Sequence, residues 1–361
     1  MSAFKRLTMT QPTFMIYGAY GYTGELIARQ AVAEGLTPVL AGRRAEALAP
    51  LAQELGLDYR DFGMHEAADI APHLDGIDVL LHCAGPFSAT APQAMAACIR
   101  ESVHYLDITG EISIFEHSFS RHDHAAKAGV VLCCGVGFDV VPTDCIAAYL
   151  AEAMPDAVEL ALGFDSRSGF SPGTAKTSVE GLADGGKIRR NGRITTVPLA
   201  ASVREIDFGD GPKQAMTIPW GDISTAWHTT SIDDIEVYMP MSPKRIKQVQ
   251  RLNWVRPLLG LSPVQSLLKK RAAKVAGPDE SRREQATTHV WGEVVNARGE
   301  HRVARVHVAN GYDVTVHASL AIVKQLLTEA PAGGSYTPSR LAGKELVERL
   351  PGSSNVELSS E

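Results

Sequence analysis

The chain has 361 residues, of which 45% are hydrophobic and 21% are charged. These proportions exclude a disordered chain, and the length favours more than one globular domain. The formal net charge of −6 argues against a dedicated nucleic-acid-binding protein. The 5 cysteines form no Cys-x-x-Cys pair and are odd in number, so we expect a reducing, cytoplasmic environment rather than a disulfide framework.

The first third of the chain alternates short apolar runs with helical patterns. Strands are predicted at residues 14–17, 38–41, 58–62, 79–83, 104–107 and 130–133, and helices at 23–34, 45–55, 92–101 and 112–128. This β-α-β rhythm predicts an α/β fold whose N-terminal domain, residues 1–144, is a Rossmann-type doubly wound parallel sheet. Residues 79–99 carry no formal charge, but Gly85, Pro86 and several polar side chains interrupt them. We therefore expect a strand, a turn and a buried helix there, and not a membrane span.

The pattern changes after residue 144. Longer alternating runs at 158–164, 235–239, 285–295 and 301–309 predict a second α+β domain, residues 145–316, with a mixed or antiparallel sheet. Residues 171–186 are rich in Gly, Ser and Thr and predict a loop leading into a helix. Residues 317–361 are predicted to form C-terminal helices that pack back on the first domain, followed from 351 onward by a frayed tail.

A glycine-rich loop lies between the first predicted strand and the first predicted helix. Gly18, Gly21 and Gly24 would let the backbone turn sharply and approach a pyrophosphate, whose charge the helix N-terminus then meets. An ordinary tight turn is the alternative. The cofactor contacts predicted in this loop are Gly18, Tyr20, Gly21, Tyr22, Thr23 and Gly24.

Two further strand ends are expected to contact the cofactor. Arg43 and Arg44 follow the second strand, where arginine suits the 2′-phosphate of NADP(H) better than the 2′-hydroxyl of NAD. We expect Arg43 to make that contact, with Arg44 as second choice and two solvated arginines as the alternative. After the fourth strand, Ala84, Gly85 and Pro86 would let the backbone approach the nicotinamide ribose.

Several of these motifs, in this order, resemble the saccharopine dehydrogenase-like oxidoreductases, and within them the branch of the trans-acting enoyl reductases. The residues that carry the resemblance are 18–24, 42–44, 84–87, 104–111 and 137–144. The resemblance implies a Rossmann domain, an inserted α+β domain with the substrate pocket, and NADP(H) as cofactor. Residues 137–144 keep only part of the Gly-Leu-Asp-Pro-Gly stretch of true saccharopine enzymes, which argues against saccharopine as substrate. The enoyl reductase branch implies instead an acyl chain, carried by a protein or as a thioester.

Hydride transfer also needs a proton donor beside the nicotinamide. Asp139 is the first candidate for a catalytic polar group at the cleft, and Tyr105, which otherwise is a core aromatic residue, is a candidate proton donor. Asp107, Thr174 and Lys176 are predicted to contact the substrate, although Asp107 and the 171–180 segment also suit caps of turns or helices. No spacing of His, Cys and carboxylates predicts a metal site.

Residues 244–274 form a basic segment interleaved with leucines and one tryptophan, and no acidic residue occurs between Glu236 and Asp279. This pattern predicts amphipathic cationic helices that suit an acidic carrier protein or an anionic membrane surface. The alternative is a solvated face beside the interface of a homodimer.

The sequence thus favours an NADP(H)-dependent oxidoreductase that reduces a C=C bond of an acyl group or a C=N bond. A non-catalytic NADP(H)-binding regulatory or scaffold protein is one alternative. An amino-acid dehydrogenase that makes or cleaves a secondary amine is another.

Overall fold

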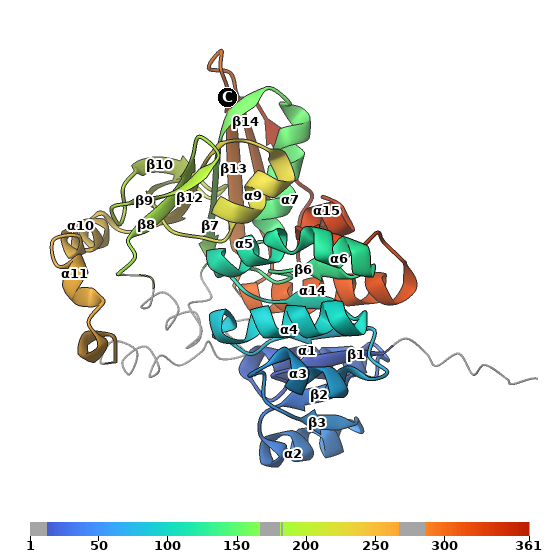
Figure 1. Cartoon of the computed structure of the whole chain (residues 1–361). Coiled ribbons are helices and arrows are strands. Elements are labelled where there is room, and N and C mark those ends of the chain that lie inside the picture. The colour runs from blue at the N-terminus through green and yellow to red at the C-terminus, as the bar shows by residue number, and fades with distance from the viewer. Residues whose placement is uncertain (1–12, 167–180, 182, 267–285, 361) are drawn as a thin grey trace, which may run out of the picture.

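The computed structural model describes residues 13–166, 181, 183–266 and 286–360. Its first sheet has seven parallel strands in the order β15-β6-β5-β4-β1-β2-β3 (Figure 1). The strands are β1 (Phe14–Tyr17), β2 (Val39–Gly42), β3 (Tyr59–Asp61), β4 (Val79–His82), β5 (His104–Asp107), β6 (Val131–Cys133) and β15 (Gly334–Tyr336). This sheet confirms the predicted Rossmann-type architecture.

Helices cover both faces of the first sheet, so that β1, β2, β4 and β6 are buried on both sides. Ile16 packs in one core cluster with residues of α1 (Tyr22–Ala33), α2 (Ala45–Leu55) and α14 (Gly311–Thr328). Its neighbour Met15 points the other way, as the period of two of a strand requires. Met15 packs in a second cluster with residues of α3 (Ala67–Ile70), the 3-10 helix η1 (Ala71–Leu74), α4 (Phe87–Glu101), α5 (Ile112–Ser120) and α6 (His122–Ala128).

The second sheet is mixed and has nine strands. Its main path runs β10-β11-β12-β7-β13-β14-β16, and β8 pairs with β12 and β9. Among the described strands of this sheet only β12 and β7 pair in parallel, and the other pairs are antiparallel. The strands are β7 (Ala157–Ser166), β8 (Gly186–Arg190), β9 (Arg193–Val197), β10 (Val203–Asp207), β11 (Pro212–Thr217), β12 (Asp234–Pro240), β13 (Thr288–Asn296), β14 (His301–Val308) and β16 (Glu357–Ser359).

Helix α7 (Val141–Ala153) connects the two sheets. It lies on the second sheet together with α9 (Asp222–Thr230), while α15 (Pro338–Ala342) and α16 (Leu346–Arg349) pack against α7. The close approach of α7 requires glycine at position 292, since a Cβ there would lie 2.6 Å from Cγ2 of Ile146. The predicted domain boundaries at 144 and 317 fall inside α7 and α14. Helices α10 (Pro243–Leu252) and α11 (Arg256–Leu259) lie to one side of the second sheet (Figure 1).

Three local predictions differ from the structure. The sequence predicts one helix over residues 112–128, but α5 and α6 meet at Arg121, whose ψ of 2° lies outside the helical range. The tail that is predicted to fray contains β16, which pairs with β14. Residues 186–217, for which the sequence predicts no strand, form β8 to β11.

Other predictions agree with the structure or lie beyond it. The uncharged residues 79–99 form β4 and part of α4 as expected. No helix in the part of the chain that the structure describes is both long and apolar enough to cross a membrane. Residues 171–180, the beginning of the predicted loop, lie outside the described residues.

Candidate functional site

The glycine loop after β1 packs so tightly that side chains would not fit at two positions. A Cβ on Gly18, whose φ is +85°, would lie 2.9 Å from the Ala84 Cβ, and a Cβ on Gly24 would lie 2.3 Å from the Gly18 carbonyl oxygen. The Gly18 amide donates to the Ala41 carbonyl at 2.7 Å, which fixes the loop against the end of β2. The N-cap residue of α1 is Gly21, which has no side chain to cap the helix. The first amide groups of α1 are therefore suited to a phosphate, whose charge the helix dipole also favours.

The two arginines after β2 occupy different environments. Arg44 places its guanidinium 4.8 Å from the centre of the Tyr20 ring, and this ring lies over Gly42, where a Cβ would come within 2.5 Å of it. Arg43 is exposed and makes no hydrogen bond or ion pair with any residue that the structure describes. Such an uncommitted guanidinium at the end of β2 fits the 2′-phosphate of NADP(H).

The loop after β4 is held by a buried histidine and a carboxylate. His82 is buried, and burial lowers its pKa to about 3, so the ring is neutral. Its Nδ1 accepts a hydrogen bond from the Ala84 amide at 3.3 Å, and its Nε2 lies 2.8 Å from the Thr90 hydroxyl. The Glu111 carboxylate accepts the first two amides of α4, both at 2.9 Å. Residues 84–86 are thereby presented at the same sheet edge as the glycine loop.

Asp107 and Tyr105, at the end of β5, form a buried brace. Both side chains are 0% exposed, and the Tyr105 hydroxyl donates to Asp107 at 2.9 Å. Asp107 also accepts the amides of Thr109 and Gly135 at 3.1 and 2.9 Å. Burial raises the pKa of Asp107 to about 6, although these two amide bonds lower it. Neither side chain reaches the surface. This placement favours a turn-capping role for Asp107 over substrate contact, and a core aromatic role for Tyr105 over proton donation.

Asp139 lies in a different setting. It follows β6, its side chain is partly exposed, and no described residue forms a hydrogen bond with its carboxylate. The carboxylate packs over Gly110, where a Cβ would lie 2.7 Å from Oδ2. Burial raises the pKa of Asp139 to about 7, because the surroundings disfavour the charged form. At neutral pH this group both gives and accepts a proton readily.

The backbone around Asp139 is fixed by unusual features. Val140, the next residue, has φ +136°, a conformation that β-branched residues adopt only under constraint. The Thr315 hydroxyl in α14 accepts the Phe138 amide at 2.9 Å and itself donates to the Gly311 carbonyl. Strain of this kind, of order 1–3 kcal/mol, concentrates at functional sites. The fold therefore holds Asp139 in place at an energetic cost.

The second sheet contributes aromatic side chains next to Asp139. Phe138 packs edge-on against Phe164 of β7 at 5.3 Å between ring centres, and Phe164 packs on Trp220 at 4.8 Å. The indole nitrogen of Trp220 is buried and forms no hydrogen bond among the described residues. The three aromatic rings thus form an apolar surface, and the indole N–H of Trp220 is a hydrogen-bond donor within it.

Sequence reasoning missed Asp222, the first residue of α9. Its side chain is 0% exposed, and neither carboxylate oxygen has a hydrogen-bond partner among the described residues. Burial raises its pKa well above the ordinary value, and the charges of Asp144 and Asp139 raise it further. The only signal in the sequence was an aspartate after a glycine at the start of a helix, which normally indicates an exposed cap. Thr174 and Lys176, the other predicted substrate contacts, lie outside the described residues.

Comparison with known proteins extends these observations. Residues 14–133 match the family model of the saccharopine dehydrogenase NADP binding domain. The trans-acting enoyl reductase of Mycobacterium leprae is 33% identical over 138 residues, which cover 36% of this chain and 33% of that protein. The saccharopine dehydrogenase-like oxidoreductase of Homo sapiens is 27% identical over 216 residues, 51% of this chain and 50% of that protein. The matches thus span a third to a half of these relatives.

Among solved structures, apo saccharopine dehydrogenase (L-Glu forming) from Saccharomyces cerevisiae has a TM-score of 0.67 to this chain, covering 96% of this chain and 100% of that one. At 11% identity, this likeness is evidence of a shared fold only. The family match, by contrast, covers β1 to β6 with the glycine loop, the Arg43 strand end and the Ala84 loop. Residues 14–133 thus match the NADP-binding domain of saccharopine dehydrogenase, and the cofactor of this chain is NADP(H).

Proposed function

We propose that this protein is an NADP(H)-dependent oxidoreductase that transfers hydride to a C=C or C=N bond, with Asp139 as the proton donor. The observation that carries the proposal is Asp139 itself. It is a carboxylate in a strained loop, with a pKa of about 7, partly exposed at the sheet edge that also presents the glycine loop. The relatives named as oxidoreductase and enoyl reductase support the reaction class.

Different residues of the chain would bind different parts of NADP(H). The tight packing at Gly18 and Gly24 holds the glycine loop close to the N-terminus of α1, which suits the pyrophosphate of the cofactor. Arg43 suits the 2′-phosphate, and the loop at Ala84 suits the nicotinamide ribose. When bound, NADPH supplies the hydride and its electron pair.

Asp139 then completes the reduction. The electrophilic carbon of the double bond would receive that hydride, and the partner atom would take up the π electrons of the bond. Asp139 transfers its proton to that atom, which is carbon for an enoyl group and nitrogen for an imine, and is left ionised. Water reprotonates it between turnovers, and its pKa near neutrality makes this exchange easy.

The test follows NADPH oxidation with a panel of enoyl thioesters, of α-keto acids with amines, and of quinones. Turnover of an enoyl thioester or an imine by the native protein, and loss of about 10²–10⁴-fold in kcat for Asp139→Asn, supports the proposal. Asp58→Asn, an exposed aspartate away from this edge, serves as the control. Tight NADPH binding without turnover of any class would favour the non-catalytic alternative.

A further inference from the structure

Helices α10 and α11 and the turns around them, residues 241–266, form a cationic arm beside the second sheet (Figure 1). A narrow apolar stripe attaches α10 to the body: Ile246 is 4% exposed, and Val249 and Leu252 are half-buried. The spacing of three residues places these side chains on one face of the helix. The Asn253 side chain adds two hydrogen bonds to the backbone of Leu199, at 2.8 and 3.0 Å. The exposed side chains of the arm lie away from this attachment.

The arm exposes an unusual amount of apolar surface. Trp254 is 91% exposed, Leu258 is 56%, Leu261 is 51% and Val255 is 41%. Single exposed apolar residues are common on protein surfaces, but a cluster within eight residues of the chain indicates an interaction surface. A nearly fully exposed tryptophan, away from every core cluster, is the clearest part of this signal.

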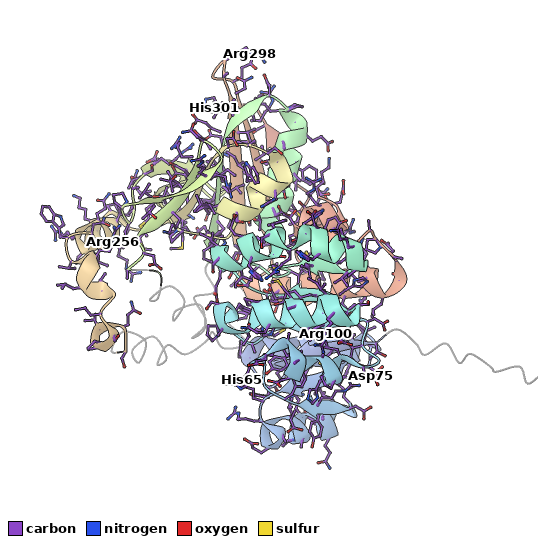
Figure 2. The ribbon with its side chains drawn as sticks, in the orientation of Figure 1. His65, Asp75, Arg100, Arg256, Arg298 and His301 are labelled. Atoms are coloured by element: carbon purple, nitrogen blue, oxygen red, sulfur yellow. The ribbon has the colours of Figure 1, made fainter. Side chains whose placement is uncertain are left out.

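The same arm carries cations and no acid. Lys244, Arg245, Lys247 and Arg251 are exposed, and none of them pairs with a carboxylate of the described residues. Arg256 lies at the start of α11 (Figure 2). The chain as a whole has a net charge of −6, yet it has no acidic residue between 236 and 279. The cations that the sequence places at 269–274 lie outside the described residues.

We propose that residues 243–261 bind the surface of an anionic lipid bilayer, with Trp254 and Leu258 among the headgroups and the lysines and arginines on the lipid phosphates. Interfacial helices combine these features: a cationic polar face, and exposed tryptophan and leucine that insert at the headgroup level. The arm lies on the membrane and does not span it. This binding is independent of the proposed hydride transfer, because the arm contains none of the residues assigned to the cofactor or to proton transfer.

The proposal is tested by co-sedimentation of the whole protein with vesicles of phosphatidylcholine, alone or mixed with phosphatidylglycerol. We expect binding only to the mixed vesicles, and weaker binding as the salt concentration rises. Lys244→Gln combined with Lys247→Gln should weaken binding about 25-fold, or about fivefold per cation, equivalent to about 1 kcal/mol each. Trp254→Ser should weaken binding as well.

Matched controls separate the arm from general surface effects. Lys127→Gln combined with Arg193→Gln removes two exposed cations elsewhere, and Leu358→Ser removes an exposed leucine of β16, so neither variant should change vesicle binding. Unchanged NADPH affinity shows that each variant is folded. Three outcomes overturn the proposal: no binding of the native protein to anionic vesicles, equal binding by the arm variants, or conversion of a lipid-free dimer into a monomer by Trp254→Ser. The last would show that a second copy covers the arm.

Discussion

Ionisation of Asp139 should lower the free energy of unfolding, and the size of this effect follows from the pKa of Asp139. Folding raises this pKa from 3.8 to about 7. Between these values the unfolded chain binds fewer protons than the native state, so stability falls as the pH rises. At 1.36 kcal/mol per pKa unit the full loss is about 4 kcal/mol above pH 7, an upper limit for a side chain that is partly exposed. Asparagine is uncharged at every pH and avoids this loss.

Asp139→Asn should therefore raise the thermal unfolding midpoint above that of the native protein at pH 8, by several degrees, and change it little at pH 4. The measurement is a series of melting curves between pH 4 and pH 8, without cofactor, in buffers of equal ionic strength. Asp58→Asn, at an exposed position, should show no such trend. A midpoint difference for Asp139→Asn that does not grow with pH would refute the reasoning, whatever the effect on turnover.

Three further substitutions test the rest of the site. Arg43→Ala should raise the NADPH dissociation constant at least tenfold, because a charge-assisted contact of about 1.5–3 kcal/mol is lost. The NADH dissociation constant should change little, since NADH has no 2′-phosphate. Titration with both cofactors checks this, and an equal effect on the two would contradict the 2′-phosphate assignment. Gly24→Ala should destabilise the protein by about 1–3 kcal/mol and weaken NADPH binding, since its Cβ would lie 2.3 Å from the Gly18 oxygen. The control is Gly181→Ala, whose Cβ would have nothing within 4 Å among the described residues. This control should be neutral in the same melting and binding measurements. Asp107→Ala leaves two buried amides and one hydroxyl without an acceptor and should lower stability by about 2–5 kcal/mol in urea denaturation; a loss below about 0.5 kcal/mol would contradict the brace.

The tight glycine loop and the place of Arg43 after a strand were predictable because their signals in the sequence are local. Gly18 and Gly24 are required by close contacts of one strand-turn-helix unit, and Arg43 follows directly from the end of β2. Two-sided burial makes β1, β2, β4 and β6 near-continuous apolar runs, which the sequence shows clearly. Such features depend mainly on residues close together in the chain.

The surroundings of the proposed catalytic and substrate residues were harder to predict, because burial of a polar group depends on distant segments. Asp107 and Asp139 both follow or end a strand of the same sheet, yet one is enclosed by the Gly135 loop and the other stays partly exposed. Asp222 resembles an exposed helix cap and is buried only because α9 packs against α7. The strands of residues 186–217 were missed for a related reason, since many of their side chains are polar and exposed.

The late position of β15 in the chain has a consequence for how the protein forms during synthesis. This strand completes the edge of the first sheet beside β6, and β16, later still, completes an edge of the second sheet beside β14. The backbone groups on the outer side of β6 therefore stay unpaired while residues 134–333 are translated, and such an open edge invites pairing with other chains. An isolated fragment of residues 1–144 would keep that edge open permanently. The sheet of the cofactor domain is thus completed only late in translation, although most of its strands are synthesised first.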